Sequence, residues 1–360
     1  MSQSNRLAVD AMGGDHAPEA IIAGLDIAAE RQPRAFFLIF GDEARLKPLL
    51  GAAKRLAGRY ELRHCAEAIT GDMKPTVGLR LRDSSMRRAI DAVLAGEARG
   101  VVSAGNTGAL LALSKIVLKT LKGIDRPAMA ATAPSAKGDV VMLDLGLNVV
   151  YDARNLVEFA LMGTVFARIV LGLPTPTFGL LNIGSEEGKG DDTLRTAAAT
   201  LRESPIAKQF YGFVEGHDIA AGTVDVVVTD GFTGNVALKT GEGALKLVGD
   251  LLRRVFSAGP LAKMGYIFAR GALKRLKETL DPRRYNGAVL LGLNGVVVKS
   301  HGGTDAEGFA HAVDVALDMA ANDFNSRIAD ALAEMDSAIL SGAPPPNNPA
   351  PNNPVTDNNG

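Results

Sequence analysis

The sequence predicts a doubly wound α/β fold, in which helices cover both faces of a mostly parallel sheet. Short apolar runs rich in β-branched or aromatic residues alternate along the chain with longer stretches of helical spacing, an alternation typical of this class. Many of the 40 glycines come directly after the apolar runs, where a chain leaving a strand must turn closely. We expect one large α/β domain over residues 1–342.

The individual elements follow from the same pattern. Strands are predicted at 7–11, 35–40, 100–104, 127–132, 139–145, 178–183, 209–214, 224–230 and 295–300, and YELRHC (60–65) also has the pattern of a strand. Helices are predicted near 18–31, 84–97, 108–121, 155–171, 192–203, 234–256 and 306–335. Ligands of such sheets bind beyond the carboxyl ends of the strands, so the loops there are where chemistry is expected.

The composition excludes several classes of protein. A formal net charge of −1 gives no global field to recruit nucleic acid. Cys65 is the only cysteine, which excludes an internal disulfide and a multi-cysteine metal site. Asp10 and Asp15 interrupt the first apolar run, and no run reaches the ~18–20 apolar residues that span a bilayer. We therefore expect a cytoplasmic protein.

Two segments differ from the rest. Residues 343–360 hold six of the 17 prolines and little that could be buried, so we expect a disordered tail there without assigning it a function. In 245–284 helical spacing continues through a break at 257–260, which predicts two helices meeting at a bend. From Arg253 to Arg284 this hairpin carries nine Lys or Arg residues interleaved with apolar ones.

Six strand-end loops carry unusual sequences, and we expect all six at one edge of the sheet, around one shared cleft. They are DAMGGDHAP (10–18), SAGNTGA (103–109), DLGLN (144–148), NIGSEEGKG (182–190), TDGFTGN (229–235) and KSHGGTDAEG (299–308). One glycine-rich loop would be a weak signal. Six at one edge favour a ligand site.

Two of these loops run from a strand straight into a helix. Asn106, Thr107 and Gly108 stand at one such start, and Asp230, Thr233, Gly234 and Asn235 at the other. Free N–H groups and the positive end of the helix dipole favour an anion there. The alternative for Asn106 or Thr107 is that it only caps its own helix.

Charged side chains in the remaining loops can also act on a ligand. Lys189 can hold phosphate as a point charge, with Glu186 beside it, or it can be an ordinary solvated lysine. Lys299 lies two residues before His301, whose imidazole is either exposed in a cleft or bonded structurally.

The 10–18 loop brings the backbone close to a neighbour at Gly13 and Gly14. Asp10 and Asp15 flank these glycines, and the two carboxylates either position an amide or a cation or cap the next helix. Asn148, at the end of its strand, offers uncharged hydrogen bonds. The chain has no nucleophile elbow, Walker loop, zinc spacing or dinucleotide fingerprint, so we expect no cofactor and no metal.

In these loops the sequence closely resembles the bacterial phosphate acyltransferases, or acyl-ACP:phosphate transacylases, of phospholipid synthesis. The strings that carry the resemblance are DAMGGDHAP, SAGNTGALLAL, GIDRPA, LLNIGSEEGKG, VVVTDGFTGNVALKT and YNGAVLLGLNGVVVKSHG, which lie within residues 5–335. The chain departs from the family pattern at Leu147, where an alanine is usual.

The resemblance implies a fold of the phosphotransacetylase and isocitrate-dehydrogenase group. It also implies reversible transfer of a fatty acyl group from acyl carrier protein to inorganic phosphate, and a homodimer held at the inner membrane surface by the hairpin. A membrane acyltransferase would then use the acyl phosphate to acylate glycerol 3-phosphate. For the hairpin, contacts with the acidic carrier or an anionic membrane surface are expected from Arg253, Arg254, Lys263, Phe268 and Arg270. Burial against a dimer partner is the alternative.

A thioester needs no covalent enzyme intermediate to react with phosphate, because a thiol with a pKa near ~8.5 leaves readily. Positioning and oxyanion stabilisation are then the tasks of the enzyme. We expect Lys189, Asn106 and Asn235 to bind phosphate or the oxyanion, and His301 or Lys299 to assist departure of the thiolate. Three alternatives stay open: a CoA-dependent phosphotransacylase, a dehydrogenase of the isopropylmalate type, and a non-enzymatic regulator that binds acyl carrier protein.

Overall fold

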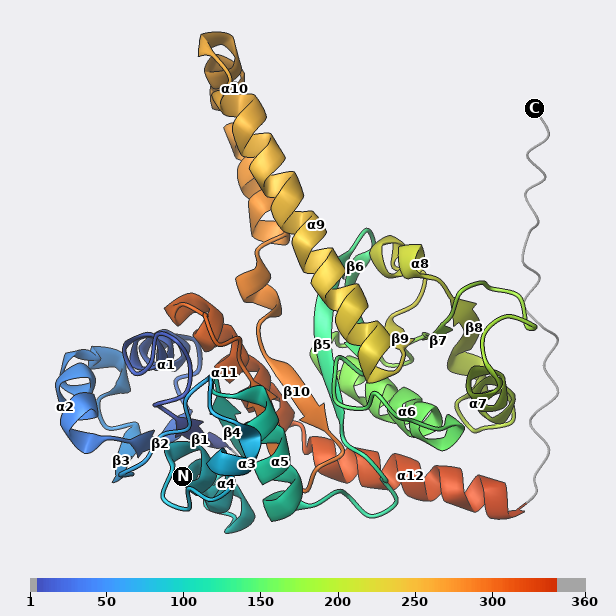
Figure 1. Ribbon diagram of the computed structural model, residues 1–360, viewed down its shortest axis with the longest axis horizontal. Helices are drawn as coiled ribbons and strands as arrows, with labels where there is room; N and C mark the ends of the chain where they lie inside the picture. The colour runs from blue at the N-terminus through green and yellow to red at the C-terminus, as the bar shows by residue number, and fades with distance from the viewer. Residues whose placement is uncertain (1–4, 342–360) are drawn as a thin grey trace.

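The computed structural model of the chain describes residues 5–341 and contains one 11-stranded sheet with helices on both faces (Figure 1). The predicted tail at 343–360 lies outside the described residues. The strands are β1 (Arg6–Asp10), β2 (Phe36–Gly41), β3 (Tyr60–His64), β4 (Gly100–Ser103), β5 (Ala128–Ser135), β6 (Gly138–Leu143), β7 (Phe178–Leu181), β8 (Phe210–Val214), β9 (Val226–Val228), β10 (Ala288–Leu291) and β11 (Val296–Lys299).

The predicted helices are present, except that the one predicted at 306–335 is two helices with a break at 322–323. The helices are α1 (Glu19–Arg31), α2 (Glu43–Ala52), α3 (Pro75–Gly78), α4 (Ser85–Leu94), α5 (Thr107–Leu118), α6 (Ala153–Val170), α7 (Asp192–Arg202), α8 (Gly216–Ala221), α9 (Gly231–Ser257), α10 (Pro260–Thr279), α11 (Ala306–Ala321) and α12 (Phe324–Ser341). Of these, α2, α3 and α8 were not predicted. Three short 3₁₀ turns, η2 (Lys54–Leu56), η3 (Ala207–Gln209) and η4 (Pro282–Tyr285), complete the described part of the chain.

Both faces of the sheet are covered, which confirms the doubly wound class. On one face, α1, α6 and α11 share a large apolar cluster that includes Phe159, Phe166 and Phe309. On the other face, α4 and α5 enclose a second cluster that includes Ile90 and Leu110. The strands between these layers are buried on both sides, so they have nearly continuous apolar sequences.

The strand order is β3-β2-β1-β4-β11-β10-β5-β6-β9-β7-β8. The neighbours are parallel except at three places, where β11 meets β10, β10 meets β5 and β5 meets β6. An odd number of reversals separates β11 from β6. As a result β1, β4 and β11 run one way, and β6, β9 and β7 run the other way.

The expectation that all six loops lie at one edge of the sheet is therefore wrong. The loops after β1, β4 and β11 end strands of one direction, and those after β6, β7 and β9 end strands of the opposite direction. The predicted strands did not include β10 (Ala288–Leu291). They did include both arms of the β5–β6 hairpin, whose turn is only Ala136 and Lys137. So short a turn makes the two arms antiparallel.

The hairpin predicted at 245–284 is formed by α9 and α10, which project from the sheet (Figure 1). Helix α9 ends at Ser257 and α10 begins at Pro260, so the bend lies where the sequence placed it. The 27 residues of α9 make a rod about 40 Å long. An edge contact between the rings of Phe256 and Tyr266, 5.8 Å apart, joins the two helices near the tip.

Candidate active site

Asp10 is the centre of the first group of loops, those that follow β1, β4 and β11. Its carboxylate is buried and accepts hydrogen bonds from the hydroxyls of Ser85 (2.6 Å) and Ser103 (2.7 Å) and from the N–H of Met12 (3.3 Å). Burial raises the pKa of Asp10, and these bonds oppose the rise. Asp10 thus joins β1, β4 and the start of α4, and the serines that hold it were not identified from the sequence.

Lys299, the last residue of β11, places an amine beside this group. Its side chain is nearly buried, and Nζ donates to the carbonyl oxygens of Ala104 (3.4 Å) and Ser300. Burial lowers the pKa of Lys299 to about 8, against the attraction of Asp10 and Asp15. Desolvation thus outweighs the attraction between Asp10 and Lys299 for both groups.

The glycines of the first loop allow the close approach that the sequence indicated. A Cβ at Gly13 would lie 2.5 Å from the Asp10 carboxylate and 2.7 Å from the N–H nitrogen of Gly105. Gly14 has a φ of 111°, which favours glycine. Asp15 is exposed, and its N–H donates to the carbonyl of Gly302 (2.8 Å). The first loop is therefore fixed against both the β4 and the β11 loops.

His301 is exposed at the surface of this group. Its Nδ1 accepts from the N–H of Gly303 (3.2 Å), and its own N–H donates to Oδ1 of Asn286 (2.8 Å). In the neutral imidazole an accepting Nδ1 leaves the proton on Nε2. The amide of Asn286 also donates to Ser300 Oγ (2.8 Å) and to the carbonyl of Gly308 (2.6 Å). Asn286 supports the loop from the end of the hairpin, and the sequence did not single it out.

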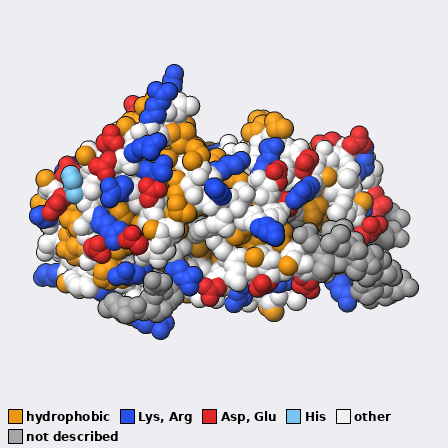
Figure 2. All heavy atoms as spheres, turned by 90° about the horizontal axis from the view of Figure 1, so that it is seen from below, with side chains coloured by type: hydrophobic (Ala, Val, Ile, Leu, Met, Phe, Trp, Pro, Cys, Tyr) orange, Lys and Arg blue, Asp and Glu red, His pale blue; other side chains and the backbone are white. Residues whose placement is uncertain are grey.

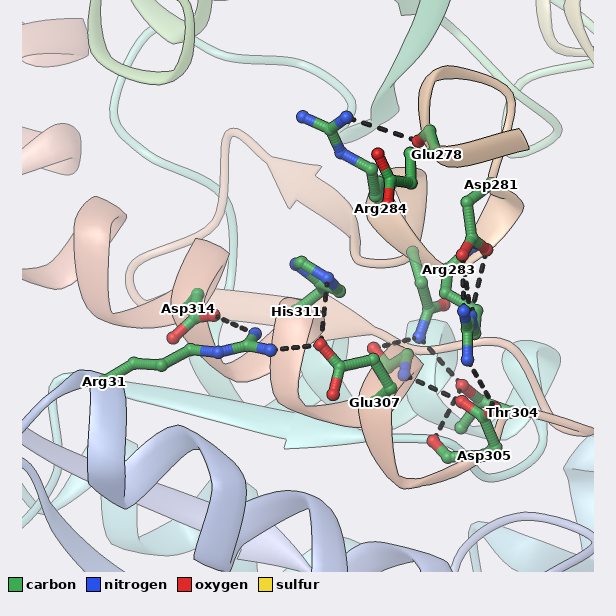
Figure 3. A network of polar contacts seen from close by, with 12 residues as sticks. Arg31, Glu278, Asp281, Arg283, Arg284, Thr304, Asp305, Glu307, His311 and Asp314 are labelled. Atoms are coloured by element: carbon green, nitrogen blue, oxygen red, sulfur yellow. Dashed lines mark hydrogen bonds and ion pairs between the residues drawn. The ribbon is translucent and has the colours of Figure 1, made fainter. Parts of the chain in front are cut away.

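A network of ion pairs fixes the far end of the His301 loop (Figure 3). Asp305 caps α11 by accepting from the N–H of Gly308 (2.9 Å), and Arg283 of η4 reaches it at 3.3 Å. Further along α11, Glu307 and Asp314 bind Arg31 of α1. The loop is thus held between the base of the hairpin and α1.

At the start of α5 the side chain of Asn106 has structural partners on both sides. Its Oδ1 caps the helix by accepting from the N–H of Ala109 (3.0 Å), and its Nδ2 donates to the carbonyls of Gly71 and Met73 (both 2.9 Å). The capping alternative is therefore what the structure shows for this side chain. The N–H groups of Thr107 and Gly108 are the donors that the helix start offers to an anion.

The second group comprises the loops after β6, β9 and β7, and Asp144 organises it. Its buried carboxylate accepts from the N–H of Asn148 (2.6 Å), from the amide of Asn148 (2.9 Å) and from the N–H of Met129 (2.9 Å). Burial raises the pKa of Asp144. Asn148 also donates to the carbonyl of Pro127 (2.8 Å), so both protons of its amide are used within the protein.

The start of α9 packs tightly on this loop. The N–H of Gly231 donates to the carbonyl of Asn148 (2.9 Å), and a Cβ at Gly234 would lie 2.0 Å from the carbonyl oxygen of Asp144. Asp230 caps α9 by accepting from Phe232 (2.8 Å) and Thr233 (2.9 Å). The side chains of Thr233 and Asn235 are exposed, with Asn235 beside Gly146.

The β7 loop carries the exposed side chains of Lys189 and Glu186. Its base is fixed by Asn182, which accepts from Ile183 (2.8 Å) and donates to the carbonyl of Lys189 (3.2 Å). The sequence analysis did not select Asn182, although an asparagine that ends an apolar strand before glycines was a usable signal. The side chain of Lys189 is exposed to solvent, and its role in binding phosphate stays a prediction.

The helices that begin at the two groups of loops, α5 and α9, lie on the same face of the sheet. Helix α5 packs on β11 and α9 on β6, with only β10 and β5 between them in strand order. In Figure 1 both helices lie on the near side of the sheet and begin at a similar height. From there α5 runs downward and α9 runs upward. Leu147, the departure from the family pattern, packs against the cluster to which α5 contributes Leu110 and Leu113.

The hairpin residues expected to contact a carrier or membrane are all exposed. Arg253, Arg254, Lys263, Phe268 and Arg270 lie near the tip, with Arg253 paired to Asp250 on its own helix. At 1.5 Å per residue, Arg253 is about 35 Å along α9 from its Asp230 cap. The tip is therefore remote from both groups of loops. None of the helices in residues 5–341 is long and apolar enough to cross a bilayer.

Comparison with known proteins identifies the family. The family described as "Fatty acid synthesis protein" matches residues 5–327. A phosphate acyltransferase from Acidiphilium cryptum is 73% identical over 326 residues, 91% of this chain and 86% of the relative. Another from Granulibacter bethesdensis is 65% identical, over 94% of this chain and 92% of the relative. The chain belongs to the phosphate acyltransferase family.

Membership confirms the resemblance, and the chain is an acyltransferase whose chemistry is acyl transfer involving phosphate in fatty acid and lipid synthesis. The dehydrogenase and the non-enzymatic regulator are therefore not supported. A phosphotransacetylase from Streptococcus pyogenes superposes with a TM-score of 0.59 at 17% identity, over 88% of this chain and 94% of its own. The EutD phosphotransacetylase from Staphylococcus aureus gives 0.55 at 16% identity, over the same shares. These structures confirm the expected fold.

Proposed function

We propose that this acyltransferase moves a fatty acyl group from acyl carrier protein to inorganic phosphate, forming acyl phosphate for phospholipid synthesis. An oxygen of hydrogen phosphate attacks the thioester carbonyl carbon and forms a tetrahedral oxyanion. The carbon–sulfur bond then breaks, and the proton released by phosphate goes to the departing thiolate. The products are acyl phosphate and free carrier thiol, and the reaction is reversible because a mixed anhydride and a thioester are both activated acyl groups.

The observation that carries this proposal is the position of Lys299 at the start of α5. Its ammonium, which comes from the end of β11, donates to the carbonyl of Ala104, two residues before the Asn106 cap. A cation from one loop therefore lies against the neighbouring loop, which carries the N–H groups of Thr107 and Gly108. The cation and the helix start favour the same kind of ligand, an anion, which is either phosphate or the oxyanion that develops on the thioester carbonyl. With a pKa of about 8, the amine can also pass a proton to a thiolate near neutral pH.

His301 is the second candidate for the proton transfer. Because its Nδ1 accepts from Gly303, its Nε2 carries the proton in the neutral form and can donate to sulfur. The second group of loops would hold phosphate from the other side through Lys189 and the exposed amide of Asn235. In this assignment Asp10, Asp144 and Asn148 keep the loops in place rather than touch the reacting atoms.

Lys189 provides a direct test of the phosphate site. Replacing it by Ala should raise the phosphate KM about tenfold or more, with a smaller change in kcat, because a point charge on the ground-state anion is lost. Lys137→Ala, an exposed lysine in the β5–β6 turn, is the matched control. An unchanged phosphate KM in the Lys189 variant contradicts the assignment.

The reaction itself is tested by release of free carrier thiol from a long-chain acyl carrier protein in the presence of inorganic phosphate. We expect release to depend on phosphate and to reverse when acyl phosphate and free carrier are supplied. The same assay with acyl-CoA as donor separates the proposal from a CoA-dependent phosphotransacylase. Faster turnover with the CoA ester than with the carrier contradicts the carrier as the natural donor.

We also propose that the chain acts as a homodimer, and that the hairpin holds it at the inner face of the cell membrane, where a membrane acyltransferase would consume the acyl phosphate. Near its tip, the apolar side chains of Val255, Leu261 and Phe268 are exposed beside Arg253 and Arg254. Such a mixture suits an anionic bilayer surface. The remoteness of the tip from the loops favours this role over carrier docking at the same residues.

A further inference from the structure

An exposed apolar surface borders the second group of loops. It consists of Val149 and Val150 after β6, Ile183 after β7, and Phe232 and Val236 at the start of α9, which are 62%, 74%, 81%, 64% and 50% exposed. We call these five residues the apolar border. Figure 2 views the molecule from below the orientation of Figure 1, and hydrophobic side chains are interspersed with charged ones over that face.

Strand register places the three segments of the apolar border side by side. Val228 of β9 is level with Leu143 of β6 and with Leu180 of β7. Beyond the strands the contact continues, because the N–H of Gly231 donates to the carbonyl of Asn148 at 2.9 Å. The apolar border therefore extends across the segments that follow three neighbouring strands, and its five residues are not isolated positions.

The backbone beneath the apolar border is fixed, so the exposure belongs to an ordered surface. Arg126 donates to the carbonyl of Val150 (2.7 Å), the side chain of Asn182 accepts from the N–H of Ile183 (2.8 Å), and Asp230 caps the N–H of Phe232 (2.8 Å). Phe232 and Val236 are one helical turn apart and share a face. An ordered apolar patch in contact with water indicates a binding surface.

Each part of the apolar border begins next to a polar residue of the candidate site. Val149 follows Asn148, Ile183 follows Asn182, and Phe232 is two residues after Asp230. A ligand with its reactive end at the polar loops therefore has its remaining length over the apolar side chains. An acyltransferase substrate has this form, a polar carbonyl end followed by a hydrocarbon chain.

The charges around the apolar border disfavour an anionic bilayer as its occupant. Glu186 and Glu187 lie in the same loop as Ile183, and Asp191 and Asp192 follow at the start of α7, with Lys189 as the loop's own cation. All five are exposed, and Glu187 and Asp192 pair with Arg202 and Arg195 of α7, which leaves Glu186 and Asp191 as the negative groups nearest Ile183 without an arginine partner among these ion pairs. Negative side chains are repelled by an anionic membrane surface, whereas a neutral hydrocarbon chain is indifferent to them. A cationic and apolar surface of the kind that membranes bind is found on the hairpin instead.

We propose that the apolar border binds the fatty acyl chain of the donor and sets the preference for long chains. This rests on the proposed function, since it assigns part of the substrate of that reaction to named side chains. Burying one methylene group changes affinity about fourfold. A border that covers even part of the chain therefore makes palmitoyl donors far better than butyryl ones.

The test compares palmitoyl and butyryl thioesters of acyl carrier protein, with kcat/KM measured for each at saturating phosphate. In Phe232→Ser and Ile183→Ser the ratio of palmitoyl to butyryl turnover should fall about tenfold, mainly through the palmitoyl KM. Leu94→Ser, which alters an equally exposed leucine at the end of α4, should keep the wild-type ratio. Because all three side chains are exposed, the variants should fold, as circular dichroism will verify.

Two other outcomes overturn the inference, and a third overturns the proposed function on which it rests. An unchanged ratio in both variants shows that the acyl chain binds elsewhere. Dissociation of the variants in sedimentation equilibrium, with the ratio intact, assigns the border to a second copy of the chain. If the wild type releases no carrier thiol from either donor, the proposed function fails. Binding of palmitate, measured by calorimetry, then tests separately whether the apolar border binds a hydrocarbon chain. Binding that is weaker in both variants than in Leu94→Ser supports the border, and equal binding refutes it.

Discussion

Substituting alanine for glycine should have opposite effects at two positions of α9. At Gly234 a Cβ would lie 2.0 Å from the carbonyl oxygen of Asp144, which is backbone and buried. At Gly241 a Cβ would meet nothing within 4 Å. Alanine in a helix interior is favoured over glycine by about 0.5–1 kcal/mol, and this gain applies at both sites.

At Gly234 the gain is opposed by overpacking, which costs about 1–3 kcal/mol or more. Because the alanine gain cancels between the two sites, the free energies of unfolding of the two variants should differ by the overpacking cost, which for an approach of 2.0 Å we take as about 3 kcal/mol. With about 2.1 cal/mol/K of unfolding entropy per residue over 360 residues, each kcal/mol shifts Tm by about 1.3 °C. Calorimetry should find Gly241→Ala melting about 4 °C above Gly234→Ala. Equal Tm values would refute the claim that the β6 loop packs directly against the start of α9.

Two further predictions concern charge. Lys299 has a pKa of about 8, and the proposed role needs its ammonium form. The wild-type kcat/KM should therefore fall as pH rises through 8. Lys299→Met should be at least tenfold slower, and its kcat/KM should not show this fall. The unfolded lysine keeps its proton until about pH 10.5, so between pH 8 and 10.5 the native state binds fewer protons and wild-type stability should rise with pH; a kcat/KM that stays level to pH 9 counts against the ammonium. Replacing Arg253 and Arg254 by Glu should weaken binding to anionic vesicles, measured by sedimentation at low salt, by about 4 kcal/mol. The same replacement at Arg80 and Arg82 should leave this binding unchanged. Full binding by the hairpin variant excludes an electrostatic contact at the hairpin.

The sequence predicted most strands to within one to three residues, because a strand buried on both faces must be apolar along its whole length. It did not predict which way the strands of the second half run. That direction depends on β10, four residues between glycine turns, and on the β5–β6 hairpin. The family, the class of fold and the hairpin were predicted correctly, while the shared edge was not.

The site loops were located from the sequence, but the work of their side chains was not. Asn106 has the expected position, yet its amide already donates to the carbonyls of Gly71 and Met73, more than 30 residues earlier in the chain. Likewise Asn286 and Ser85 reach the site from distant elements. Local pattern identifies which loops meet a ligand, whereas long-range hydrogen bonds decide which side chains in them are free to do so.

The two ends of the hairpin lie next to different groups of loops. Its outgoing helix begins at the Asp230 cap, and its return, after η4, reaches Asn286, which holds the N–H of His301. The hairpin is thus a long arm that is anchored at its base to both groups of loops. Any surface or partner that tilts the tip, about 40 Å away, acts on the spacing between those two groups. A force applied at the tip would therefore bear on both groups of loops.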